Sequence, residues 1–200
     1  HEADRDRSLI LDAIKSADSS VILAMDRWHS DLKPVLEDKQ AVHLSIEEGL
    51  NDEELKDVLE LDNLYTLNLG RARLGWETES WNRLGNYEGL RVLQIRVSDD
   101  GELNAITEMT DLERLYLRTG SDVTSLSPLS ALSRLEVLFL ETKSKKGLPS
   151  LLKSLDGIKS LLLEVSDGGI DNEVIETISK MDSLQTLALA NLAEDSTLTP

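Results

Sequence analysis

Residues 106–117 read Ile-Thr-Glu-Met-Thr-Asp-Leu-Glu-Arg-Leu-Tyr-Leu, with large apolar residues at the first, fourth, seventh, tenth and twelfth positions. The same pattern starts again at residues 58, 84, 129, 152 and 178, so successive copies begin 22 to 26 residues apart. The last six residues of the copies are 64–69, 90–95, 112–117, 135–140, 158–163 and 184–189. A repeat of this period indicates stacked copies of one small structural unit.

Each copy predicts one short strand and one helical segment. The Leu-x-Leu ending alternates with period two, which is typical of a strand whose leucines point inward. The apolar residues upstream are spaced as on one side of a helix, as Leu103, Ile106 and Met109 show. The repeated unit is therefore a strand plus a helix or helical turn.

Two weaker copies precede the six clear ones. Residues 41–46 match the strand positions with Ala41 in place of the first leucine, and residues 18–23 keep only the two inner positions. Terminal repeats are expected to be atypical, because one of their faces meets water. We therefore predict eight parallel strands.

The chain has no marked linker, so we expect a single domain over residues 1–200. Residues 4–17 predict an amphipathic capping helix, with Ile10, Ala13, Ile14 and Ala17 facing the core. The repeats then span 18–192, and 193–200 form a polar tail.

The pattern resembles that of the leucine-rich repeat family, and the resemblance covers nearly the whole chain. It implies an α/β solenoid, curved into an arc, with about eight short parallel strands on the concave face and helices or helical turns on the convex face. The family usually carries Asn three residues after the last leucine of each strand. Here those positions hold Gly49, Ala72, Ser98, Gly120, Lys143, Ser166 and Leu192. We therefore expect the backbone groups of these turns to use other partners.

Composition excludes several classes of function. The net charge is −17, which argues against nucleic acid and anionic membranes as partners. No run of 18 apolar residues occurs, so no membrane span is expected. Cysteine is absent, which removes zinc–thiolate sites and cysteine nucleophiles and favours a cytoplasmic protein, although an extracellular one stays open.

Motifs of catalysis are also missing. The chain has no phosphate-binding Gly-x-x-x-x-Gly-Lys loop, no Gly-x-Gly-x-x-Gly and no Gly-x-Ser-x-Gly. A histidine that acts as a general base needs a nucleophile to activate, and the sequence indicates none for His1, His29 or His43. We expect no enzymatic activity, no cofactor and no metal site.

Between the inward leucines, alternate strand residues should face outward on the concave sheet. On the middle strands these include the predicted partner contacts Gln94, Arg96, Arg114, Tyr116, Arg118, Phe139, Glu141, Leu162 and Glu164. Tyr116, Phe139 and Leu162 share one position on three successive strands. Exposed aromatic residues beside arginine are typical of interface hot spots. The alternative is that these side chains pack on one another and only stabilise the sheet.

The longest connector, residues 71–81, holds two of the three tryptophans. Trp81 lies three residues before the apolar Leu84 and is expected in the core. Trp76 has no such register, so we predict it to be exposed beside the concave rim as a further partner contact. The alternative is a buried Trp76.

The leading functional hypothesis is a protein–protein interaction module that binds another protein on its concave sheet. The alternative is an acidic inhibitor or immunity-type protein that masks a basic enzyme or toxin, which the net charge supports. A third possibility is self-association through the C-terminal edge strand, because no capping helix is predicted after it.

Overall fold

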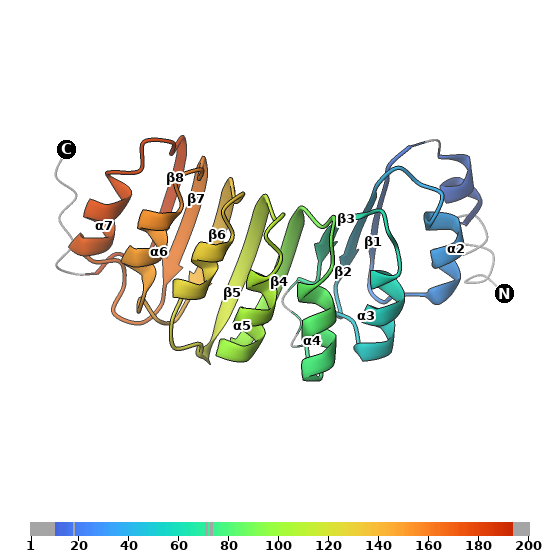
Figure 1. Ribbon diagram of the computed structural model, residues 1–200, viewed down its shortest axis with the longest axis horizontal. Coiled ribbons are helices and arrows are strands. Elements are labelled where there is room, and N and C mark those ends of the chain that lie inside the picture. The colour runs from blue at the N-terminus through green and yellow to red at the C-terminus, as the bar shows by residue number, and fades with distance from the viewer. Residues whose placement is uncertain (1–10, 18, 71, 73, 194–200) are drawn as a thin grey trace.

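A computed structural model describes residues 11–17, 19–70, 72 and 74–193. All strands belong to one sheet, in which every pair is parallel and strand order follows chain order. The strands are β1 (Val21–Met25), β2 (Val42–Ile46), β3 (Leu64–Asn68), β4 (Val92–Asp99), β5 (Arg114–Asp122), β6 (Val137–Thr142), β7 (Ser160–Val165) and β8 (Thr186–Ala190). Figure 1 shows them side by side from one end of the molecule to the other.

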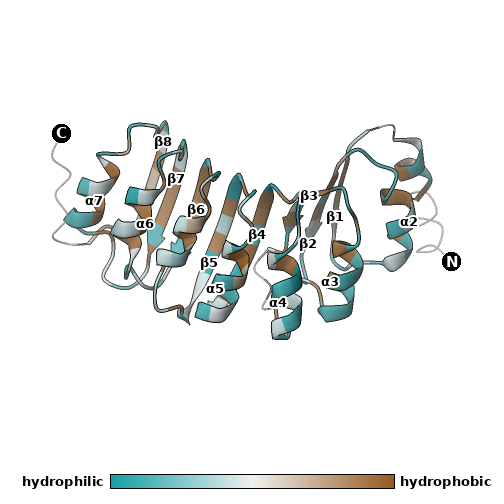
Figure 2. Cartoon of the chain, viewed as in Figure 1, coloured by the Kyte–Doolittle hydropathy of each residue, from teal (hydrophilic) through white to brown (hydrophobic). Residues whose placement is uncertain are grey.

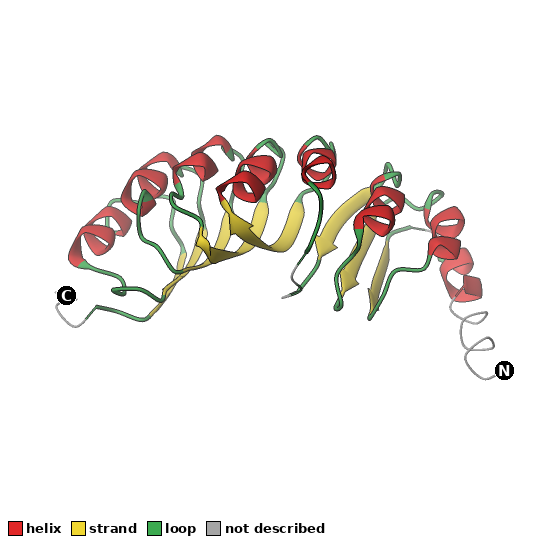
Figure 3. Ribbon diagram, turned by 90° about the horizontal axis from the view of Figure 1, so that it is seen from below, coloured by secondary structure: helices red, strands yellow, loops and turns green. Residues whose placement is uncertain are grey.

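Helical segments connect the strands on one side of the sheet. They are η1 (Ser30–Leu32), α2 (Lys33–Leu36), α3 (Asp52–Leu59), α4 (Thr78–Gly85), α5 (Asp100–Thr107), η2 (Ser127–Ala131), α6 (Leu148–Ser154) and α7 (Asn172–Ile178). Figure 3 shows these helices along the outer side of an arc and the strands along its inner side. The predicted fold class, an α/β leucine-rich repeat solenoid with eight parallel strands, is confirmed.

Local sequence explains where the helices begin. Asn51 caps α3, because its Oδ1 accepts from the Glu54 amide at 3.0 Å while the Glu54 carboxylate accepts from the Asn51 amide at 2.9 Å. Asp99 and Asp171 cap α5 and α7 through the same kind of side-chain bond. Proline stands in the first turn of η2 and α6, where a missing N–H costs little.

The N-terminal cap agrees with the prediction only in part. Residues 11–16 are helical and Ile14 is buried, but Ala13 is exposed, so its predicted inward position is wrong. Adjacent helical residues point about 100° apart, and a helix that contacts the core along one narrow stripe buries only one of them. The rest of the predicted helix, residues 4–10, lies outside the described residues.

The core is one continuous layer between the strands and the helices. Its rungs are leucines paired in register across neighbouring strands: Leu67, Leu93, Leu115, Leu138 and Leu161 are each at most 1% exposed. In Figure 2 hydrophobic bands recur on the strands between hydrophilic ones, and the helices also carry a mixture of the two. No helix in the described ranges is long and apolar enough to cross a bilayer.

Several of the turns without the family asparagine, those after β4 to β7, use two other sets of partners. Strand pairing extends past the last leucine, with Val97 opposite Thr119 and Thr142 opposite Val165. In addition, the Thr119 hydroxyl donates to Thr142 Oγ1 at 2.9 Å, and the Thr142 hydroxyl donates to the Ser144 carbonyl at 2.9 Å. Longer strands and buried threonine hydroxyls thus satisfy the turn, as expected for buried polar groups.

Candidate binding surface on the concave sheet

Nine of the ten residues predicted as partner contacts lie together on β4, β5, β6 and β7. We call them the concave patch: Gln94, Arg96, Arg114, Tyr116, Arg118, Phe139, Glu141, Leu162 and Glu164. Parallel register places them in three rows that cross the strands, which are about 4.8 Å apart. Because the strand repeat has period two, all three rows project from the face opposite the leucine core.

The middle row is mainly apolar. Gln94 is in register with Tyr116, Tyr116 with Phe139, and Phe139 with Leu162. The Tyr116 and Phe139 rings have centroids 6.2 Å apart and planes tilted by 31°. All four side chains are half-buried. These rings therefore pack against each other, as the alternative interpretation holds, and still present part of their surface to solvent.

A charged row lies beside the apolar one, towards the carboxyl ends of the strands. It runs from Arg96 through Arg118 and Glu141 to Glu164. Arg118 forms an ion pair with Glu141 between β5 and β6. Glu164 accepts a hydrogen bond from the Asn191 side chain at 3.2 Å. Three of the four charged groups in this row therefore have partners within the protein.

Arg96 is the exception in this row. Within the described part of the chain, its guanidinium has no ion pair or hydrogen bond, and its Nε is buried without an acceptor. Its neighbour in register on β5 is another arginine, Arg118. On the side of β3, the Asn68–Gln94 pair is the last in register, and Gly70, two residues further on, has no side chain to offer.

Arg114 lies in the third row, on the other side of Tyr116. It is exposed and stands in register between Val92 and Val137, neither of which is ionisable. No ion pair or hydrogen bond joins its side chain to another residue of the described ranges. The concave patch thus holds two arginines for which no carboxylate partner lies within the described residues.

The prediction for Trp76 is wrong, because this side chain is only 8% exposed. Its Nε1 donates to the Leu50 carbonyl at 2.6 Å, and its ring contacts Trp81 edge-on with centroids 4.8 Å apart. Burial of an indole is favourable when its single N–H finds an acceptor, and here the Leu50 carbonyl of the preceding repeat supplies one. Trp76 is therefore excluded from the concave patch, and the alternative of a buried side chain holds.

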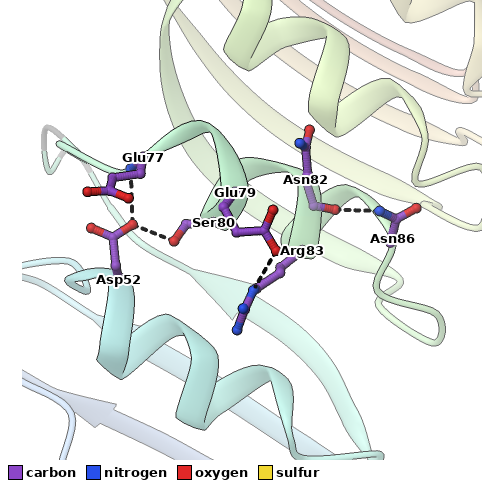
Figure 4. A network of polar contacts seen from close by, with 7 residues as sticks. All are labelled: Asp52, Glu77, Glu79, Ser80, Asn82, Arg83 and Asn86. Carbon is purple, nitrogen blue, oxygen red and sulfur yellow. Dashed lines mark hydrogen bonds and ion pairs between the residues drawn. The ribbon is translucent and has the colours of Figure 1, made fainter.

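The polar contacts of this connector are structural. Asp52, at the start of α3, accepts hydrogen bonds from the Glu77 amide at 3.0 Å and from the Ser80 hydroxyl of α4 (Figure 4). The Ser80 hydroxyl is the main cause that lowers the pKa of the Asp52 carboxyl, followed by the Glu77 amide. Figure 4 also shows the ion pair of Glu79 with Arg83 and the bond from Asn86 to the Asn82 carbonyl within this region. The contacts of Asp52 join two neighbouring repeats on the convex side, whereas the other two lie within α4 and at its end, and none belongs to the concave patch.

One exposed cluster was not predicted as a site. Ile22 is 81% exposed on β1 and lies in register with His43, whose ring centroid is 5.4 Å from that of Tyr65. Tyr65 is 37% exposed. The β2–β3 register shifts between Val42 and His43, which displaces Tyr65 from the regular alternation. The repeat pattern contains no signal for this shift.

Comparison with known proteins gives structural similarity only. No protein-family model matches the chain, and no curated protein matches it. An internalin C2 from Listeria monocytogenes is 15% identical, with a TM-score of 0.44, over 79% of this chain and 84% of that one. Another internalin from the same organism is 20% identical, with a TM-score of 0.33, over 84% of this chain and 65% of that one. The class of the protein, an open α/β solenoid of leucine-rich repeats, follows from its own strands and rungs.

Proposed function

We propose that this protein is an interaction module that holds a partner protein on its concave patch. The observation that carries the proposal is the half-buried row of Tyr116, Phe139 and Leu162, flanked by the unpaired Arg96 and Arg114. Aromatic side chains beside arginine supply most of the binding free energy in many interfaces. Part of each ring is already packed, so the exposed remainder is held in place before a partner arrives.

The fold supports this role through rigidity. The concave patch is built on four strands that are hydrogen-bonded to one another, and its other face rests on a continuous leucine core. Side chains on such a support lose little conformational freedom on binding. A curved sheet also presents all three rows to one partner at the same time, as extended repeat surfaces do.

The decisive experiment removes both rings. Partners captured by the wild-type protein from a lysate of its source organism are identified by mass spectrometry, purified and titrated against Tyr116→Ala/Phe139→Ala. Since a hot-spot side chain contributes about 2 kcal/mol or more, we expect the affinity to fall by about 100-fold or more.

The matched control is Ile22→Ala/Tyr65→Ala, which removes two exposed apolar side chains outside the concave patch. It should bind like the wild type. Circular dichroism checks that both variants are folded. An unchanged affinity of a folded Tyr116→Ala/Phe139→Ala variant would refute the proposal.

A second candidate is self-association through β8. Leu187 continues the leucine row of Leu138 and Leu161, yet it is 46% exposed, and Leu192 is 43% exposed. Within the described sheet, β8 pairs with β7 alone. An edge strand next to exposed leucines favours pairing with a second copy.

Sedimentation over a 100-fold range of concentration tests the self-association. The wild type should show a mass that rises from one copy to two, and Leu187→Glu should remain a monomer at every concentration. A wild type that stays monomeric throughout would contradict this candidate.

The inhibitor hypothesis has less support. A surface that masks a basic enzyme should be acidic where it makes contact. The residues that β4 and β5 contribute to the concave patch instead include Arg96, Arg114 and Arg118, whereas the carboxylates of these strands, Asp99 and Asp122, lie at their C-terminal ends. The excess negative charge lies elsewhere on the molecule, so it favours solubility over recognition at this surface.

A further inference from the structure

The concave patch has a local charge opposite to that of the whole protein. The chain carries a net charge of −17, yet β4 and β5 place three arginines on one face. Of these three, Arg118 alone has a carboxylate partner among the described residues, Glu141 of the next strand. Arginines that serve only solubility are expected to lie singly in solvent or beside carboxylates. Two unpaired ones on either side of an aromatic residue need another explanation.

Of the two unpaired arginines, Arg96 indicates more directly which chemical group a partner would supply. Its Nε is buried and has no acceptor in the described structure. The guanidinium as a whole has no ion pair or hydrogen bond with a described residue, so its charge is left without a carboxylate partner. The guanidinium has a planar set of donors that matches the two oxygens of a carboxylate. Arg118 meets that requirement with Glu141, whereas Arg96 is in register with Arg118 on β5 and lies beyond the last registered pair with β3, Asn68–Gln94.

Geometry relates the two arginines to the aromatic row. Arg96 and Arg114 stand on adjacent strands, on opposite sides of the Gln94–Tyr116 pair. Their rows are four residues apart along the strand direction, a distance of about 13 Å. An extended segment of five residues spans the same distance, with its middle side chain over the apolar row.

We infer that the concave patch recognises an acidic segment of the partner protein, in which an aspartate or glutamate carboxylate binds Arg96 and a neighbouring apolar side chain covers Tyr116 and Phe139. A second carboxylate of the segment lies over Arg114. This inference rests on the proposed function, because it names the chemistry of the partner at the same surface. Nucleic acid offers anionic phosphates too, but the net charge of −17 opposes a polyanion.

The experiment is a selection of random twelve-residue peptides displayed on phage against purified protein. Peptides enriched on the wild type should contain Asp or Glu near an apolar residue. Arg96→Glu should enrich Lys or Arg at the same place instead, because the charge that selects the residue is reversed. The control Lys153→Glu makes the same change of charge on the exposed side of α6 and should give the wild-type preference.

An enriched acidic peptide is then titrated against point variants. Arg96→Gln keeps the approximate size of the side chain without its charge, and it should weaken binding by about tenfold or more, since a charge-assisted hydrogen bond is lost. Arg96→Gln also serves if Arg96→Glu does not fold. Lys153→Glu should leave the affinity unchanged.

The outcomes separate this inference from the proposed function. Peptides that lack acidic residues, or whose affinity does not change in Arg96→Gln, overturn the inference. If those same peptides lose affinity for Tyr116→Ala/Phe139→Ala, the concave patch still binds protein and only the acidic chemistry is wrong. No enrichment on the wild type, or enrichment that none of these variants alters, overturns the inference as well.

Discussion

At the scale of single residues, carboxylates at helix starts join one repeat to the next. Asp100, at the start of α5, accepts from the Thr124 amide at 2.7 Å and from the Thr124 hydroxyl. Asp171, which caps α7, pairs with Lys145 of the preceding repeat. The side-chain partner is in each case the main cause that lowers the pKa of the carboxyl. Acidic residues in this protein therefore have a structural role beyond solubility.

Lowered pKa values predict a specific dependence of stability on pH. A carboxyl whose pKa is lower in the folded state stabilises the fold above its unfolded pKa of about 4, and that contribution is lost as pH falls through the folded pKa. Asp100→Asn should therefore be less stable than the wild type at pH 7, and the difference should shrink below about pH 4. Urea unfolding at pH 7, 5, 4 and 3 measures the difference.

Asp38→Asn is the control for this pH series. Asp38 is exposed, and its side chain makes no hydrogen bond or ion pair with another described residue, so its removal should have little effect at any pH. Comparing each variant with the wild type at the same pH cancels the overall effect of the −17 charge. A deficit of Asp100→Asn that stays constant down to pH 3 would contradict the assigned role.

At the scale of the elements, each strand is stable only because another repeat covers its leucines. Leu138 on β6 is 1% exposed between Leu115 and Leu161, whereas Leu187 on β8 has one neighbour in the row and is 46% exposed. The two residues have the same chemistry and the same position in the repeat. Their difference in burial comes from stacking alone.

Truncation of these two leucines measures the contribution of stacking. Leu138→Ala should lower the free energy of unfolding by about 2–5 kcal/mol, because it leaves a cavity in a packed core. Leu187→Ala should lower the free energy of unfolding by less than half as much. Leu187 is 46% exposed, so its side chain has fewer packing contacts to lose. Urea unfolding followed by circular dichroism provides both values, and equal losses would be inconsistent with the observed order of strands.

At the scale of the whole molecule, the arc separates two kinds of surface. The convex side carries helices whose polar contacts, such as Asp52 with Ser80, hold successive repeats together. The concave side carries the rows of the concave patch, where Arg96 and Arg114 remain without partners in the described chain. Curvature brings side chains from four strands onto one concave surface, which no single repeat could form.

The period of the leucines was enough to predict the order of the strands, their parallel direction and the face on which each side chain stands. These properties are local, because alternation within a strand and the spacing between copies are both read from neighbouring residues. The same logic placed Tyr116 and Phe139 in one row. It failed at Trp76, where a longer connector interrupts the repeat.

By itself, the sequence determined a stack of strand–helix units with a variable concave surface. Hydrophobic residues that recur with a fixed period are buried together when each repeat packs against the next. Only the tertiary structure decided that Arg118 is neutralised while Arg96 is not, and that Trp76 lies in the core. Those outcomes depend on distances between side chains of different repeats. Such distances arise when the repeats stack, and no pattern within a single repeat encodes them.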